Sequence, residues 1–220
     1  MFLKTDGAGN LSFSSDLPTT SFTGATVETS IADSDLVLIY DDSATAVRKM
    51  TKANLVAGIG ASAGQVIQVV STTKTDYFSS SSSSFVDITG LSVSITPSNS
   101  SNKILVICYI NGIGANAASG TFGHQLQLVR NSTNIAVGDT AGSRSVATGS
   151  LGGQDSPPFA QSTTISFLDT PSTTSSTTYK VQTRHTQSKT MRINSAWNDE
   201  TDATYGLRTV STITVMEIKG

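Results

Sequence analysis

The feature that most constrains this chain is a series of short apolar runs separated by turn-forming residues, from about residue 65 to the end. Within several runs, apolar and polar side chains alternate with a period of two, as in half-buried antiparallel strands. In residues 91–96, for example, serines separate Leu91, Val93 and Ile95. Clusters of Ser, Thr, Asn and Pro lie between the runs, and no segment after residue 65 shows the periodicity of a long helix. The pattern therefore predicts antiparallel β-sheet.

The strands that these runs predict fill a region large enough to bury a core of its own. They are 65–73, 84–89, 91–96, 103–111, 122–130, 133–137, 162–168, 177–185, 190–194 and 208–218. Many short strands in one region indicate a β-sandwich, and we expect a jelly roll. We predict an all-β fold: an antiparallel β-sandwich (jelly roll) preceded by an extended N-terminal arm with a β-hairpin and one short helix.

The N-terminal part of the chain has a different character. Residues 1–30 are rich in Ser, Thr, Gly and Asp without sustained periodicity, which indicates an extended arm with at most short strands. Residues 35–40 and 46–50 predict a β-hairpin, and residues 52–57 a short helix ended by Gly58. A two-stranded unit is marginally stable in water. This part should therefore depend on the second part, on identical neighbours or on a larger assembly.

A small-residue linker separates the two parts. It runs from Gly58 to Gly64, and we place the domain boundary there. We predict an anchoring or interlocking arm over 1–63 and a jelly-roll domain over 64–220. The serine run at 79–84 is interpreted as a hairpin loop rather than a disordered linker.

Two predicted strands lack the alternation of the others. Residues 104–110 are apolar on both faces, and residues 210–218 nearly so. A sandwich strand normally shows one face to solvent, so something must cover the outer face. A loop, the N-terminal arm or a neighbouring subunit could do so. The residues that we predict for a subunit interface are Ile104, Val106, Cys108, Ile110, Ile213 and Val215.

Composition excludes several classes of protein. Charged residues are 14% of the chain, the net charge is −2 and hydrophobic residues are 37%. There is no basic stripe for nucleic acid, and the apolar content is too high for a disordered acidic tail. We find no signal peptide and no apolar run of membrane-spanning length, so we expect no membrane insertion. The single cysteine, Cys108, lies in an apolar run, and we interpret it as a buried hydrophobe.

Two motif matches are rejected. Residues 60–64 fit G-x-S-x-G, but a nucleophile elbow needs a strand before the serine and a helix after it, and here the order is reversed. Residues 112–117 fit G-x-G-x-x-A, but a strand follows where a dinucleotide-binding loop needs a helix. His124 and His185 have no second ligand at metal-binding spacing, and we interpret them as strand-surface residues. We predict no enzyme activity, no cofactor and no metal site.

One predicted loop, residues 194–206, concentrates aromatic and acidic side chains. Aromatic rings stack on sugars, and carboxylates accept hydrogen bonds from sugar hydroxyls or hold Ca²⁺. The simpler interpretation, which we favour, is a polar loop whose tryptophan packs on the sandwich end or on a neighbour. The candidate glycan contacts are Trp197, Asp199, Asp202 and Tyr205.

The residues also carry a resemblance to a known group of proteins. The run from Ala32 to Thr51 resembles a segment common near the N-termini of structural proteins of tailed bacteriophages, especially marine ones. The second part resembles the β-rich C-terminal domains attached to such segments. The matching stretches are 64–70, 84–91, 102–106, 165–171 and 211–217.

This resemblance implies a virion fibre, spike or decoration protein. Such proteins are often trimers whose C-terminal domains resemble the tumour-necrosis-factor or C1q jelly roll, in which an apolar strand face packs about the threefold axis. We therefore expect a non-enzymatic virion protein, a trimeric surface fibre or spike component synthesised in the host bacterial cytoplasm. Its arm would anchor it to capsid, portal or tail components. The predicted anchoring residues are Leu36, Val37, Leu38, Ile39, Tyr40 and Leu55.

Three other functions stay open at this point. Within the same class, the protein could be a capsid decoration (cement) protein. It could instead be a carbohydrate-binding module that recognises a host cell-surface glycan through the 194–206 loop. An enzyme such as a glycan depolymerase ranks third, because these enzymes often use long β-helices and the sequence shows no coil-length repeat.

Overall fold

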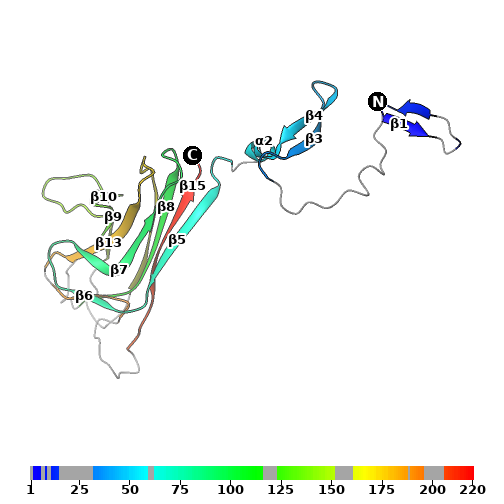
Figure 1. The fold of residues 1–220 in the computed structure, drawn as a ribbon. Helices are drawn as coiled ribbons and strands as arrows, with labels where there is room; N and C mark the ends of the chain where they lie inside the picture. Colours follow the sequence, from blue (N-terminus) through cyan, green and yellow to red (C-terminus); the bar gives the residue numbers. More distant parts are fainter. Residues whose placement is uncertain are drawn as a thin grey trace. The chain divides into compact units, whose positions relative to one another are not determined.

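The structure, a computed structural model, describes residues 2–5, 8, 11–14, 32–58, 62–115, 123–151, 161–187, 189–195 and 206–220. The chain divides into two compact units, Met1–Gly60 and Ala61–Gly220, and each is described by itself (Figure 1). The arm and domain boundaries predicted from the sequence, 1–63 and 64–220, remain a prediction.

The described residues of the first unit form two hairpins and a helix. Strands β1 (Phe2–Thr5) and β2 (Leu11–Ser14) pair with each other, as do β3 (Leu36–Asp41) and β4 (Ala46–Thr51), in both cases antiparallel. Helix α2 (Lys52–Gly58) follows β4 directly. The Thr51 hydroxyl accepts a hydrogen bond from the Asn54 amide, the usual arrangement of a helix N-cap. The predicted hairpin and short helix are confirmed.

The described residues of the second unit form two antiparallel sheets. The first sheet has the order β5, β15, β8, β12, with β14 and β6 continuing it beside the far end of β8. Its strands are β5 (Val66–Lys74), β15 (Ser211–Ile218), β8 (Lys103–Ala115), β12 (Gln161–Asp169), β14 (Met191–Ile193) and β6 (Phe78–Ser80). The second sheet has the order β7, β13, β9, with two short strands on the far side of β9. Its strands are β7 (Val86–Ile95), β13 (Thr177–His185), β9 (His124–Arg130), β10 (Thr133–Ile135) and β11 (Gly149–Leu151).

The pairing is nested from the ends of the unit inward. Strand β5 pairs with β15, β7 with β13, β8 with β12, and β9 with both β10 and β11. First-with-last pairing of this kind, distributed over two sheets, is the topology of a jelly roll. The predicted fold class, an all-β antiparallel sandwich, is confirmed.

Two strands differ from the prediction for identifiable reasons. The segments predicted at 84–89 and 91–96 form one strand, β7, because Gly90 lies at a register shift opposite β13. Gly90 has φ +82°, which a residue with a side chain rarely adopts. The glycine therefore permits a β-bulge at this point, and the strand continues on both sides of it. The serine run is partly a strand as well, since β6 extends to Ser80 and pairs with β14.

The core lies between the two sheets and is almost entirely aliphatic. It is formed by one face of each long strand, and Tyr179 is its largest aromatic member, fully buried. The core residues are Ile88, Leu91, Val93, Ile95, Ile104, Val106, Cys108, Ile110, Ile113, Leu126, Leu128, Ile135, Ile165, Tyr179, Val181, Ile193, Ile213 and Val215. Leu91, Val93 and Ile95, which alternate with serines in the sequence, thus all face the core.

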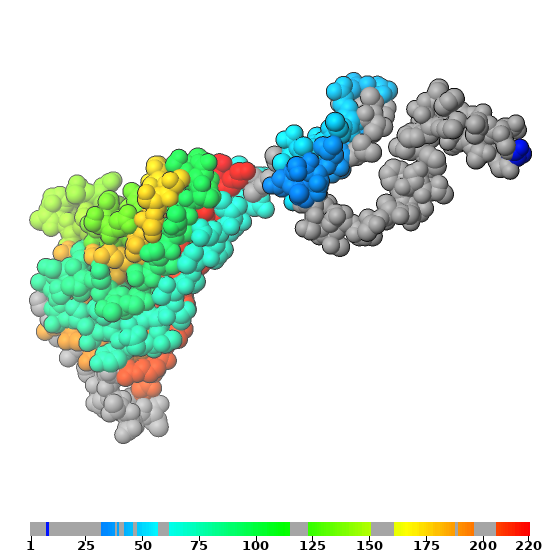
Figure 2. All heavy atoms as spheres, viewed as in Figure 1, coloured from blue at the N-terminus to red at the C-terminus, as the bar shows by residue number. Residues whose placement is uncertain are grey.

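The N-terminal and C-terminal ends of the second unit lie at the same end of the sandwich, as Figure 1 shows. The Gly64 amide donates to the Lys219 carbonyl at 2.7 Å, and the Lys219 amide donates to the Gln65 carbonyl at 2.9 Å. Strands β5 and β7 approach each other along one border of the sandwich, where β5 appears in cyan in Figure 2. The segment that leads toward the first unit therefore leaves the sandwich beside the C-terminus.

Candidate interaction surface

The outward side chains of the first sheet form the candidate site. In β8, Ile104, Val106 and Cys108 are fully buried in the core. Because successive side chains of a strand point to opposite faces, Leu105 and Ile107 lie on the outer face. Both are only half-buried.

This alternation corrects the residues predicted for a subunit interface. All six have exposed fractions of 0% within a single chain, so another subunit has no access to them. They are Ile104, Val106, Cys108, Ile110, Ile213 and Val215. Their burial against the opposite sheet explains why they are apolar, but it leaves the apolar residues between them unexplained.

Those intervening residues form an apolar row across all four strands. Met216 of β15 lies directly opposite Val69 of β5 on one side and Leu105 of β8 on the other. Leu105 in turn lies opposite Leu168 of β12. Residues opposite each other in an antiparallel pair share a face and touch. Val69 is 56% exposed and Leu168 is 48% exposed, so the row is open to solvent at both borders of the sheet.

Neighbouring rows add two more large apolar groups among short hydroxyl side chains. Ile107 lies opposite Thr214 and Ser166, and Tyr109 lies opposite Thr212 and Thr164. Tyr109 is exposed. The outer face of this sheet therefore carries an apolar row from border to border, with Ser and Thr on one side of it and Lys103 and Ile218 on the other.

The outer face of the second sheet has the opposite character. Lys180 Nζ and Gln182 Nε2 both donate to the Asp87 carboxylate at 2.8 Å. Arg184 Nε donates to the side-chain oxygen of Gln125 at 2.8 Å. On this face, polar side chains of neighbouring strands therefore form hydrogen bonds with one another, and the face is compatible with contact with water. The same sandwich thus carries one face suited to solvent and one that is not.

The β3–β4 hairpin with α2 is the second candidate surface, proposed from the sequence as the particle anchor. Leu36 is 56% exposed, and Val37, Ile39 and Leu55 are half-buried within this unit. Val56 of α2 is exposed as well. The side chains of Leu38 and Tyr40 lie outside what the structure describes. The hairpin therefore leaves apolar area uncovered, as expected for an element too small to form a core.

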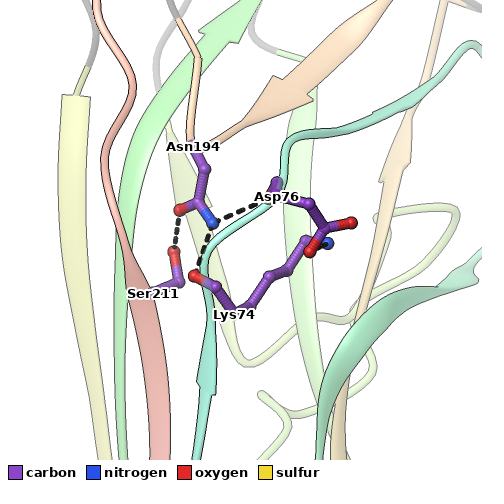
Figure 3. A network of polar contacts seen from close by, with 4 residues as sticks. All are labelled: Lys74, Asp76, Asn194 and Ser211. Carbon is purple, nitrogen blue, oxygen red and sulfur yellow. Dashed lines mark hydrogen bonds and ion pairs between the residues drawn. The ribbon is translucent and has the colours of Figure 1, made fainter.

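The candidate glycan contacts, Trp197, Asp199, Asp202 and Tyr205, lie outside the described residues. The segment that precedes them is held by a polar network (Figure 3). Its members are Lys74, Asp76, Asn194 and Ser211.

Asn194 is the hub of this network, and its backbone has φ +63°. Its Nδ2 donates to the carbonyls of Lys74 and Asp76, at 2.9 and 3.0 Å. Its Oδ1 accepts from Ser211 Oγ at 2.6 Å. The Lys74 ammonium, almost fully buried, donates to the Asp76 carboxylate at 2.9 Å, and this bond lowers the pKa of Asp76. These contacts join the end of β5 to the start of β15.

The two histidines are core-facing rather than surface residues, which corrects the sequence-based interpretation. His124 and His185 are a cross-strand pair with ring centroids 5.6 Å apart, and both are buried. Burial and the neighbouring His185 lower the pKa of His124 to about 4. His185 Nδ1 accepts hydrogen bonds from the amides of Gln187 and Lys189, so that nitrogen carries no proton. Both rings are therefore neutral at pH 7.

The described residues hold no cluster of metal ligands and one buried thiol. Among them, no three His, Cys, Asp or Glu side chains lie close enough to hold a metal ion. Burial raises the pKa of Cys108 to about 12, so its thiol is protonated and unreactive at neutral pH. None of the helices in the described part of the chain is long and apolar enough to cross a membrane.

Comparisons with known proteins add little. No family model and no curated protein matches the chain. Among solved structures, it is similar to the VP2 subviral particle of infectious bursal disease virus, with TM-score 0.31 and 12% identity over 87% of this chain and 46% of that one. It is also similar to dimeric latent PorU from Porphyromonas gingivalis, with TM-score 0.28 and 10% identity over 84% of this chain and 18% of that one. The chain spans about half the length of the first and about a fifth of the second.

Proposed function

We propose that this chain is a non-enzymatic structural protein of a virion, a surface fibre or spike component of a tailed bacteriophage that assembles as a homotrimer. The observation that carries the proposal is the difference between the outer faces of the two sheets. A sandwich that leaves an apolar row open on one face and a satisfied polar surface on the other is expected of an assembly subunit. The sequence resemblance given above supplies the kind of assembly.

In this proposal, the N-terminal part anchors the protein to capsid, portal or tail components. The exposed Leu36 and Val56 support this role, because docking into a larger structure would remove their apolar area from water.

The first test asks whether the protein is part of the particle. Purified virions are analysed by mass spectrometry, and an antibody against the full chain is located on intact virions by electron microscopy. We expect the protein at a fixed copy number, with label on the particle surface. Absence from purified virions would contradict the proposal. Label spread over the capsid shell would favour a decoration protein over a fibre.

The second test addresses anchoring through the hairpin. The full-length double variant Leu36→Asp and Val56→Asp should enter particles poorly, because both aspartates would have to be buried at the docking site. The matched control is Ala53→Asp with Asn54→Asp, which adds the same charge at exposed positions of α2. Equal incorporation of the two variants would contradict an anchor built on Leu36 and Val56.

A host-glycan receptor module is the alternative from another functional class. Its candidate residues, Trp197 among them, lie outside the described part of the chain, so no structural observation favours it. A glycan-array experiment with Trp197→Ala decides it, since unchanged binding in that variant would remove this site from consideration.

A further inference from the structure

We propose that the outer face of β5-β15-β8-β12 is the surface through which this chain binds another copy of itself, centred on the row of Val69, Met216, Leu105 and Leu168. The inference rests on the proposed function, because it assigns residues to the self-association proposed there. The sequence suggested six residues of β8 and β15 that the structure buries in the core. The proposed surface instead uses the outward residues between them, Leu105 and Met216, together with Val69 of β5 and Leu168 of β12.

The row is continuous, and its members touch in sequence across the sheet. Its inward counterpart consists of Val70, Val215, Val106 and Phe167, one position along each strand, packed in the core. The sheet is therefore apolar on both sides at the same level. The inner side is covered by the second sheet, and the outer side is left exposed at Val69 and Leu168.

Charge on this face favours a second copy as the occupant. Along the paired region only one of the outward positions, Lys103, carries a charge, and none is a carboxylate. The outward positions are Val69, Ser71, Thr73, Lys103, Leu105, Ile107, Tyr109, Thr164, Ser166, Leu168, Thr212, Thr214, Met216 and Ile218. In a homotrimer the same face of three copies packs about the threefold axis with identical charges, so a nearly uncharged face can pack there without like-charge repulsion. A strongly charged partner would find almost nothing here to pair with.

The size of the face also suits an interface between folded subunits. Four strands spaced about 4.8 Å apart, and about eight residues long at about 3.4 Å each, cover on the order of 500 Å² before side-chain relief is counted. A standard protein–protein interface buries about 800 Å² per partner. The face therefore supplies more than half of the contact that a stable complex needs.

The experiment measures self-association of the full-length chain by sedimentation equilibrium. The test variant is Val69→Glu with Leu168→Glu, which places two charges at the most exposed ends of the row. The matched control is Thr89→Glu with Ser92→Glu, which adds the same charge to exposed positions of β7, the border strand of the polar face. Far-ultraviolet circular dichroism and thermal unfolding establish that each variant is folded.

We expect the wild type and the control to have the same dissociation constant for self-association. The dissociation constant of the test variant should be at least about 100-fold higher, because each glutamate would be buried without a partner. If the glutamates prevent folding, Val69→Ser with Leu168→Ser replaces them, and about a tenfold weakening is expected. Equal association of test and control variants would overturn the inference. So would a wild-type chain that is monomeric at micromolar concentration, as it would be if its own arm covered the face.

The outcome is separable from that of the proposed function. A chain that associates through this face but is absent from virions would leave this inference standing and contradict the virion role. If the chain is found on virions but its self-association is unchanged by the substitutions at Val69 and Leu168, the virion role stands and this inference is contradicted.

Discussion

Tyr179 Oη donates a 2.6 Å hydrogen bond to Asp169 Oδ2, and the two residues belong to different sheets of the sandwich. Arg130, opposite Tyr179 on β9, adds a second link, with its guanidinium 2.9 Å from the same carboxylate. Tyr179 is fully buried and Asp169 nearly so. Burial, and then the bond to Asp169, raise the pKa of Tyr179 well above its ordinary value, so the phenol is a hydrogen-bond donor at neutral pH. This contact ties β13 to β12.

The phenylalanine variant Tyr179→Phe should therefore destabilise the sandwich by about 1–3 kcal/mol, because a buried carboxylate loses a donor while the packing is unchanged. Urea unfolding measures the difference. Tyr77→Phe, at an exposed position outside the proposed self-association surface, serves as the control and should stay within about 0.5 kcal/mol of wild type. Equal stabilities of the two variants would show that the Tyr179–Asp169 bond contributes nothing.

The Asn194 network predicts a second large effect. Asn194→Ala removes three side-chain hydrogen bonds. It also places alanine at φ +63°, a backbone conformation that asparagine adopts more readily than alanine does. We expect a loss of about 2–4 kcal/mol in urea unfolding. Asn134→Ala, at an exposed position of β10, is the control and should change little. A small effect at Asn194 would mean that the network forms without being needed.

Stability should fall as the pH is lowered from 6.5 toward 4. The folded pKa of His124, about 4, lies below the ordinary value of 6.5, so the unfolded chain takes up the proton first. The stabilisation from neutral His124 is therefore complete above pH 6.5 and is lost as the pH approaches 4, by about 1.4 kcal/mol per pH unit and about 3 kcal/mol in all. His185, whose pKa is also lowered by burial, acts in the same direction.

The measurement is the free energy of unfolding in urea at several pH values. The variant His124→Gln with His185→Gln should flatten the slope between pH 6.5 and 4.5 whatever its stability at pH 7. Below pH 4.5 the wild type and the double variant should lose stability together, because of Glu217. Burial raises the pKa of Glu217, but hydrogen bonds from Asn102 and Ser98 outweigh this effect and leave the folded pKa below its ordinary value. An unchanged slope between pH 6.5 and 4.5 in the double variant would exclude the histidines as its cause.

Cys108 should report global unfolding. Its thiol is fully buried and its pKa is raised by burial to about 12, so a thiol reagent at pH 8 should not react with the native protein over hours. In urea above the unfolding midpoint the reaction should be complete within minutes. Rapid reaction without urea would mean that β8 opens locally.

The sequence predicts the sandwich well because turn clusters and alternation are local signals. Residues 177–185 were predicted at the observed bounds of β13, where Tyr179 and Val181 alternate with polar residues. The doubly apolar run 104–110 shows where this signal stops. Ile104 and Leu105 are equally apolar, so the sequence cannot say which faces inward. The register with β15 and β12 decides it, and that register depends on contacts far apart in the chain.

The histidine pair was missed for a related reason. His124 and His185 are far apart in sequence, and only the β9–β13 register places them side by side. The one local hint is Gly123, where a β-carbon would lie within 3 Å of the His185 ring. Such a close approach cannot be recognised before the pairing is known.

Sedimentation equilibrium of the wild-type full-length chain measures the proposed self-association itself. At micromolar concentration and neutral pH, we expect a mass three times the 22.9 kDa of one chain. A mass of 22.9 kDa under the same conditions would contradict it.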